Sequence, residues 1–94
     1  MSYEWDDAKA TSNYANHGVT FEYASRVFWQ DARRVTVEDN RRDYGEKRLT
    51  AFGEIEGRVY VVSFTRRGDI IRIISARKGN KREQKKYYTL RAGS

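Results

Sequence analysis

The hydrophobic positions of residues 19–29 fall three or four residues apart, which predicts a helix with one apolar face. The apolar residues of that face are Phe21, Ala24, Val27 and Phe28. Thr20 can cap this helix at its N-terminus. The preceding residues 6–18 predict another helix, because an Asp at either of the first two positions can cap it and Gly18 can end it. We therefore expect two consecutive short helices.

The pattern changes after residue 33 to short runs rich in β-branched and aromatic residues, which favour strands. Four such runs are residues 34–39, 47–55, 58–65 and 70–77. Their connections are short and contain turn-prone residues, including Asn40, Gly45, Gly57 and Gly68. Strands that follow one another through short connections pair as an antiparallel meander. Residues 2–6 are predicted to be a short edge strand or an extended lead-in.

A third helix is predicted over residues 80–90, where Asn80 and Glu83 have the spacing of a capping box. The expected fold class is therefore α+β: two N-terminal helices, an antiparallel sheet of about four strands, and a C-terminal helix. The helices are expected on one face of the sheet, which leaves the other face or its rim for a ligand. The length of 94 residues predicts a single domain spanning residues 1–94.

Charge is distributed unevenly along this chain, whose net charge is +6. Residues 66–94 contain ten Lys or Arg and two Asp or Glu, whereas residues 1–65 contain nine and eleven. The basic last third is therefore the candidate region for binding an anion.

The residue types present argue against several classes of site. Cys is absent and His17 is the only histidine, so disulfides and thiolate metal sites are excluded and a metal site is not expected. The chain begins without a signal-peptide pattern and has no apolar run long enough to cross a membrane, so we expect a cytoplasmic protein.

Strict alternation along the last two strands predicts which arginines share a face with apolar residues. In residues 70–77 the expected shared face carries Ile71, Ile73, Ser75 and Arg77. In residues 58–66 it carries Tyr60, Val62, Phe64 and Arg66. Guanidinium groups at the edge of an apolar sheet suit phosphate, because Arg presents a planar set of donors and stays charged. Which of Arg66, Arg72 and Arg77 converge depends on the strand register.

The predicted C-terminal helix adds further positive charge beside two aromatic residues. The candidate RNA-binding residues of this segment are Lys78, Lys81, Arg82, Lys85 and Tyr87, with Lys86 alongside. A tyrosine in a basic cluster can stack on an unpaired base. The alternative for Tyr87 is that it packs the helix on the sheet, and for the charges that they form a solvated face.

Three segments in order and at this spacing resemble the BrnT toxin family of bacterial toxin–antitoxin systems, a branch of the RelE-like ribonuclease fold. They are "YEWDDAKATSNYANHGVTFEYASRVF", "RRDYGEKR" and "IIRIISARKGNKREQKKYY". The resemblance implies an mRNA-cleaving toxin that needs no metal or cofactor. It also implies neutralisation by a BrnA-type antitoxin whose DNA-binding domain represses the shared operon.

RNA carries its own nucleophile, so cleavage needs a base near the 2′-hydroxyl, cations at the phosphorus and a proton for the leaving oxygen. The candidate catalytic residues are Arg77, Arg66, Arg48 and Glu46. Arg48 lies in the segment that matches the central motif, where an ion pair with Glu46 or Asp43 is the alternative role. Proton transfer by Glu46, Glu83, Lys47, His17 or a tyrosine is chemically possible, and no base is assigned.

Two other functions fit the same charge distribution. A basic domain that binds RNA or DNA without cleaving it would have this pattern, as would a protein whose basic face binds an acidic partner. The identity of the RNA, a requirement for the ribosome and the antitoxin-binding surface do not follow from the sequence.

Overall fold

A computed structural model describes residues 1–40 and 45–92, and its centre is a five-stranded sheet. The strands are β1 (Ser2–Glu4), β2 (Val35–Asp39), β3 (Arg48–Ile55), β4 (Arg58–Arg67) and β5 (Ile70–Lys78). Their order across the sheet is β1-β5-β4-β3-β2, and every neighbouring pair from β2 to β5 is antiparallel. The antiparallel meander expected from the short connections is therefore confirmed.

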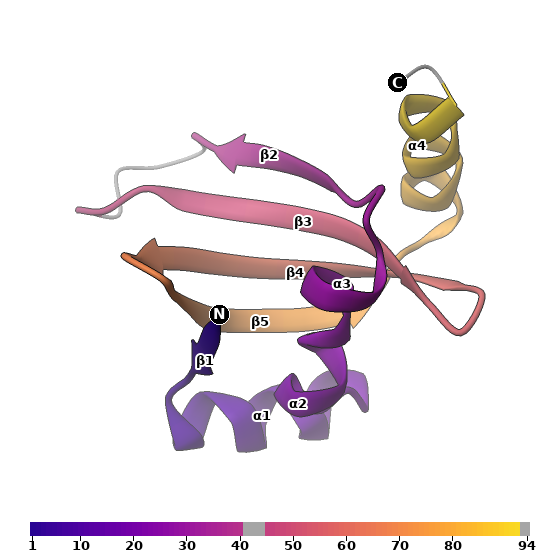
Figure 1. The fold of residues 1–94 in the computed structure, drawn as a ribbon. Coiled ribbons are helices and arrows are strands. Elements are labelled where there is room, and N and C mark those ends of the chain that lie inside the picture. The colour runs from indigo at the N-terminus through magenta and orange to yellow at the C-terminus, as the bar shows by residue number, and fades with distance from the viewer. Residues whose placement is uncertain (41–44, 93–94) are drawn as a thin grey trace.

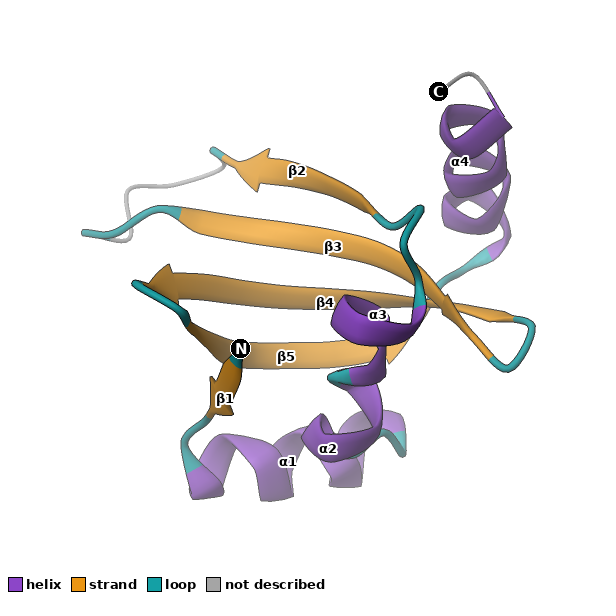
Figure 2. Ribbon diagram, in the orientation of Figure 1, coloured by secondary structure: helices purple, strands orange, loops and turns teal. Residues whose placement is uncertain are grey.

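The helices are α1 (Asp7–His17), α2 (Phe21–Ala24), α3 (Arg26–Gln30) and α4 (Lys81–Ala92). Figure 2 shows α1, α2 and α3 together on one side of the sheet, with α4 apart from them. The expected caps are present: Asp6 Oδ1 accepts from the Lys9 amide at 3.0 Å, and Thr20 Oγ1 accepts from the Tyr23 amide at 3.1 Å. Gly18 ends α1 with a φ of +69°, a conformation that glycine adopts at little cost.

The fold differs from the expectation in three details. β1 is the short edge strand that was one of the two predictions for residues 2–6; it makes a fifth strand, and it pairs with β5 in parallel. The second predicted helix is divided into α2 and α3 at Ser25, whose hydroxyl donates to the Glu22 carbonyl at 2.7 Å. Such a local side-chain bond competes with continued helical pairing. Finally, α4 does not join the other helices but contacts β2 and β4.

The face of the sheet that packs on α1–α3, which we call the helix-covered face, contains the core. Its buried sheet residues include Ala51, Ile55, Tyr60, Val62, Phe64, Ile71, Ile73 and Ala76. They pack against Phe21, Ala24, Val27 and Phe28, the apolar helix face expected from the sequence. Gly53 allows α3 to come close, because a Cβ there would lie 2.5 Å from Val27 Cγ1. The opposite face, which we call the open face, carries Thr50, Phe52, Val61, Ser63, Ser75 and Arg77.

An irregularity in β5 decides which of its side chains reach the open face. Ser63 pairs with Ser75, but the next residue, Phe64, pairs with Ile73, so Ile74 is an extra residue on β5. A bulge of this kind shifts the alternation of side chains by one position. Ile71 and Ile73 therefore lie on the helix-covered face, whereas Ser75 and Arg77 lie on the open face. The expectation that these four residues share one face was wrong.

The outer edge of β5 beyond the bulge is held by a side chain in place of a strand. Asn13 of α1 donates to the Ala76 carbonyl at 2.8 Å and accepts from the Ala76 amide at 3.0 Å. Its side-chain nitrogen also lies 3.0 Å from the Val19 carbonyl. Asn13 is buried, and these bonds fix the backbone of β5 one residue before Arg77.

Candidate functional site

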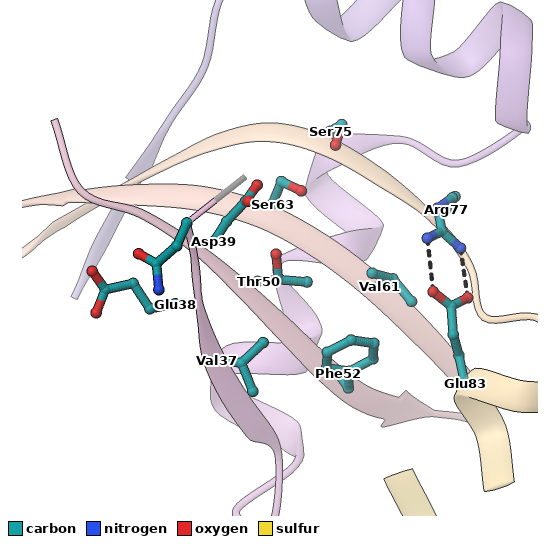
Figure 3. A pocket seen from close by; sticks show the side chains of 11 residues that line it. Val37, Glu38, Asp39, Thr50, Phe52, Val61, Ser63, Ser75, Arg77 and Glu83 are labelled. Carbon is teal, nitrogen blue, oxygen red and sulfur yellow. Dashed lines mark hydrogen bonds and ion pairs between the residues drawn. The ribbon is translucent and has the colours of Figure 1, made fainter. Parts of the chain in front are cut away.

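A pocket of about 410 Å³ lies on the open face, between the β2 edge and the first turn of α4 (Figure 3). Its lining comes from β2, β3, β4, β5 and α4, together with Asn40 after β2. The pocket therefore forms only when the meander is complete and α4 is in place. The lining residues are Val37, Glu38, Asp39, Asn40, Thr50, Phe52, Val61, Ser63, Ser75, Arg77 and Glu83.

A row of three hydroxyl groups crosses the floor of this pocket. Thr50 pairs with Ser63, and Ser63 pairs with Ser75, so the three residues stand side by side on neighbouring strands. Neighbouring strands are about 4.8 Å apart, which makes the row roughly 10 Å long. All three residues are partly exposed. The hydroxyl groups can donate or accept hydrogen bonds along the whole floor.

Arg77 stands at the α4 end of the pocket and is held there by Glu83. Arg77 Nη1 lies 2.7 Å from Glu83 Oε1, and Arg77 Nη2 lies 2.8 Å from Glu83 Oε2 (Figure 3). Two parallel N–H to carboxylate bonds orient a guanidinium more strictly than a single bond. The Arg77 side chain is 41% exposed, so a solute that enters the pocket can reach it.

Glu83 also makes the expected capping box at the start of α4. The Asn80 amide donates to Glu83 Oε1 at 2.9 Å, and the Glu83 amide donates to Asn80 Oδ1 at 2.8 Å. The hydrogen bonds from Arg77 outweigh the effect of burial and lower the pKa of Glu83 below its usual value. One carboxylate thus begins the helix and positions the arginine.

Buried Asp31, just after α3, attaches α4 to the sheet. Asp31 Oδ2 accepts from the Glu54 amide at 2.8 Å and from the Tyr87 hydroxyl, while Oδ1 accepts from the Arg33 amide at 2.9 Å. Burial opposes ionisation of Asp31, but these bonds outweigh it and lower the pKa of the carboxyl. Burial and the bond to Asp31 raise the pKa of Tyr87, which stays protonated as the donor.

Glu54 on β3 provides a second attachment. The Tyr88 hydroxyl donates to Glu54 Oε2, and Arg91 Nη1 lies 3.8 Å from the same oxygen. The hydrogen bond to Glu54 raises the pKa of Tyr88. Together with the Asp31 contact, these bonds make α4 a fixed wall of the pocket.

The end of the open face away from α4 carries a second group of charges. Arg72 lies 3.6 Å from Glu4 of β1, and Arg67 lies 3.9 Å from Glu4 and 3.8 Å from Glu46. At the same end of the sheet Lys47 pairs at 3.5 Å with Glu38, which lies on the helix-covered side because its register partner is Leu49. The positive and negative charges are balanced here by neighbours, in contrast to the excess of cations on α4.

The structure brings only some of the predicted catalytic residues to one face. Arg48 lies on the open face, because it is two residues before Thr50 on β3. Arg72 and Arg77 also share that face as a result of the bulge. Arg66 does not: its guanidinium carbon lies 5.9 Å from the centre of the Phe64 ring, on the helix-covered side.

The remaining predicted residues are distributed around α4 and the β2–β3 connection. Glu46 is exposed outside the pocket lining, and its carboxylate lies 3.8 Å from Arg67 Nη2. Asp43, the other predicted partner of Arg48, and Tyr44 of the central motif lie outside the described residues. The predicted RNA-binding residues that are exposed are Lys78, Lys81, Arg82 and Lys85, with Lys86 alongside.

Tyr87 differs from the other predicted RNA-binding residues because it is only 1% exposed. Its ring packs between α4 and the sheet, which is the alternative role considered from the sequence. Stacking of a base on Tyr87 would require α4 to move. Tyr88, at 41% exposure, is the accessible aromatic of the pair.

Sequence reasoning missed the hydroxyl row and Asp39. The hydroxyl residues lie in three different strands, so only the register aligns them. The segment 70–77 departs from strict alternation at two adjacent apolar pairs, Ile70–Ile71 and Ile73–Ile74, and the bulge lies at the second pair. In the described part of the chain, no three His, Asp or Glu side chains are grouped to hold a metal ion. No described helix has the length and apolar character needed to span a membrane.

Comparison with known protein families gives a match over most of the chain. No curated protein matches the chain. A family model described as the ribonuclease toxin BrnT of type II toxin–antitoxin systems matches residues 5–83, which include α1 to α3, β2 to β5 and the first three residues of α4. The matched range contains Arg77 and ends at Glu83, the two residues that face each other in the pocket. The chain belongs to the BrnT family of ribonuclease toxins of type II toxin–antitoxin systems.

Proposed function

We propose that this protein is an endoribonuclease toxin that binds single-stranded mRNA on the open face and cleaves it without a metal ion. The observation that carries the proposal is Arg77, which a bidentate contact with Glu83 aims into a pocket floored by hydroxyl groups. A fixed guanidinium can bind a phosphate and stabilise the negative charge that develops on it during cleavage. Membership of a ribonuclease toxin family supports the same activity.

The reaction proposed is internal transfer within the RNA. The ribose 2′-oxygen forms a bond to phosphorus, the bond from phosphorus to the 5′-oxygen breaks, and the leaving oxygen takes up a proton. The products are a 2′,3′-cyclic phosphate and a 5′-hydroxyl end. Arg77 acts on the phosphate, and Thr50, Ser63 and Ser75 orient the ribose and phosphate oxygens. We assign no general base.

Glu83 and RNA phosphate both interact with Arg77 in this proposal. A guanidinium carries five N–H donors, so it can contact a phosphate beside a carboxylate. Because Glu83 is anionic, the phosphate experiences repulsion from it as well as attraction to Arg77. The exposed cations Lys81, Lys85 and Lys86 offset this repulsion by attracting the RNA backbone to α4.

The antitoxin is the second partner. The family is one of type II systems, in which a protein antitoxin neutralises the toxin. We propose a BrnA-type antitoxin that represses the shared operon as a complex, and we propose that it blocks access to the open face.

Cleavage that depends on the ribosome remains compatible with the same pocket, because the ribosome would supply the RNA in an ordered form.

The test is incubation of the purified protein with a defined single-stranded RNA in the presence of EDTA, followed by mapping of the product ends. We expect cuts that leave 2′,3′-cyclic phosphates, and we expect the Arg77→Ala variant to leave the RNA intact. Intact RNA with the parent protein, repeated with translating ribosomes and with the same result, would reject the activity. Binding without cleavage would then identify a basic RNA-binding module.

A further inference from the structure

The two edges of the sheet differ in what covers their backbone, and β1 and β2 are the outermost strands. Next to β1, the outer edge of β5 is bound at Ala76 by the Asn13 side chain, which takes the place of a strand. β2 has no such cover in the described part of the chain, where no backbone hydrogen bond from outside the sheet reaches Thr36, Val37 or Glu38. Figure 1 shows β2 as the border of the sheet, with α4 beside its start.

The pairing of β3 shows which residues of β2 direct their backbone groups away from the sheet. Along an antiparallel strand, the N–H and C=O groups of successive residues point to opposite sides. The Glu54 amide points to the β2 side of β3, where it donates to Asp31 Oδ2 at 2.8 Å. Thr50, an even number of positions away on β3, points the same way and therefore bonds to Val37, its register partner. The residues on either side of Val37 thus direct their N–H and C=O groups outward.

These two residues are Thr36 and Glu38, and each contributes one donor and one acceptor to the edge. Their spacing is that of two residues in a strand that bond to the same neighbour. An extended peptide can therefore add to this edge as a further strand. Charges, proline and glycine usually prevent such pairing, and none of them is present in Val35, Thr36 and Val37.

The side chains beside this edge indicate the character of the added peptide. Val35 and Val37 pair in register with Phe52 and Thr50, which line the pocket, so both valines lie on the open face. Val37 is 37% exposed. Side chains of an added strand that stand opposite the two valines share this face, and apolar side chains would cover them. Because Val37 lines the pocket, the added strand would also border the pocket.

We propose that the outer edge of β2 binds an extended segment of the antitoxin as a sixth strand of the sheet. The side chains of this segment opposite Val35 and Val37 are apolar. The flank that leaves the strand at the Val35 end meets α4 and is acidic, because α4 carries an excess of exposed cations. These cations are Lys81, Arg82, Lys85 and Lys86. The inference rests on the antitoxin proposed above as the partner and is independent of the cleavage reaction.

A protein segment fits this edge better than RNA or a second copy of the chain. The edge presents carbonyl oxygens as well as amides, and an ionised phosphate can accept hydrogen bonds but cannot donate them to a carbonyl. A second copy carries the same net charge of +6 and is therefore repelled. An acidic peptide has both kinds of backbone group and the opposite charge.

The first experiment measures binding of the purified antitoxin from the same operon to the parent toxin, Thr36→Pro and Thr36→Ala by calorimetry. Proline removes the outward N–H of Thr36 and leaves the bonds to β3 intact, whereas alanine keeps the N–H and removes only the side chain. We expect Thr36→Pro to bind about tenfold more weakly and Thr36→Ala to bind within about twofold of the parent. Equal binding by the parent and folded Thr36→Pro, or no binding by the parent, would overturn the proposal.

Hydrogen exchange tests the same edge in the parent protein, without a variant. The amides of Thr36 and Glu38 should exchange about tenfold more slowly, or slower still, in the complex with the antitoxin, while those of β1 keep their rates. Unchanged exchange at Thr36 and Glu38 would overturn the proposal. Protection of these amides by single-stranded RNA alone, or a dimer that Thr36→Pro abolishes, would assign the edge to RNA or to a second copy and would also overturn it.

The salt dependence of antitoxin binding tests the acidic flank. Binding should weaken as the salt concentration rises, because the contact between the flank and the exposed cations of α4 is screened. Affinity that is independent of salt would overturn the assignment of an acidic flank.

RNA cleavage with and without the antitoxin separates failure of this inference from failure of the proposed function. Thr36→Pro should cut RNA at the rate of the parent, because Thr36 is outside the pocket lining, but the antitoxin should inhibit it less. Equal inhibition of both proteins would reject the inference and leave the ribonuclease proposal standing. Intact RNA with both proteins, together with antitoxin binding that Thr36→Pro weakens, would reject the ribonuclease proposal and leave the β2 edge as the antitoxin site.

Discussion

The two faces of this sheet differ in what holds their side chains. On the helix-covered face, Phe64, Ile71 and Ile73 are almost completely buried against three helices. On the open face, Ser63, Ser75 and Arg77 are partly exposed, and the described helix that borders them is α4. Residues of the same strands therefore serve two purposes: one set stabilises the fold, and the other remains accessible to a ligand. The difference teaches that stability and binding can be altered separately along a single strand.

The largest expected effect is on the free energy of unfolding, and it comes from a comparison of Phe64 and Ser63, two neighbours on β4. Phe64→Ala should lower the free energy of unfolding by about 3–5 kcal/mol, because it leaves a cavity in the core. Ser63→Ala should change it by less than about 1 kcal/mol, since Ser63 faces the pocket. Urea unfolding followed by circular dichroism measures both. Similar losses for the two variants would mean that the open face is packed as tightly as the core.

The next comparison concerns two arginines on opposite faces. Arg77→Ala should slow RNA cleavage by about 10²–10³-fold, the usual effect of removing a donor to developing charge. Arg66→Ala should slow it by less than about tenfold through reduced long-range attraction, because its guanidinium lies over Phe64 on the other face. Initial rates with a fluorescent RNA give both values. Equal losses would show that RNA contacts both faces of the sheet.

A smaller effect is expected at the attachment of α4. Asp31→Asn should lower the free energy of unfolding at pH 7 by about 1–3 kcal/mol, because the buried donors lose a charged acceptor. The lowered pKa of Asp31 also makes its contribution depend on pH. That contribution is present above the unfolded value near pH 4 and is lost as the pH falls through the lower folded value.

Urea unfolding at several pH values between 7 and 2 tests the pH dependence. The parent should lose stability as the pH falls below about 4, and Asp31→Asn should lose less over the same interval. An identical slope in both proteins would mean that Asp31 does not titrate differently in the folded and unfolded chains.

The smallest expected effect concerns the exposed lysines of α4. Replacing both Lys85 and Lys86 with Ala should weaken RNA binding several-fold and reduce the slope of log K against log salt by about 1.4, as for two contacts to a single strand. Lys9→Ala on α1 is the control, because that helix covers the other face. A reduction in slope of the same size for Lys9 would indicate binding without a preferred face.

Much of the local structure followed from short-range patterns. The caps at Asp6 and Thr20, the glycine that ends α1 and the Asn80–Glu83 capping box were all predicted and are present. These features depend on residues within four positions of each other, so the local sequence contains the information. The basic helix α4 and the four-strand meander were also predicted, because short-range patterns in the sequence indicate them.

The candidate site was predictable only in part. Arg77 was identified as a candidate because it ends an apolar strand in a basic region, but its face was assigned wrongly. The contact between Arg77 and Glu83 and the position of Asp39 opposite Arg48 depend on how separate elements meet. The burial of Tyr87 likewise depends on Asp31, which lies 56 residues earlier in the chain.

The sequence by itself determined the number and order of most elements, the excess of positive charge at the C-terminal end and the residues that form the core. The tertiary structure decided which side chains meet. One extra residue at Ile74 moves Ser75 and Arg77 to the open face, and the register then aligns Ser75 with Ser63 and Thr50. The physical reason is that a side chain's face depends on every pairing before it in the strand, so one bulge reverses the face of all that follow.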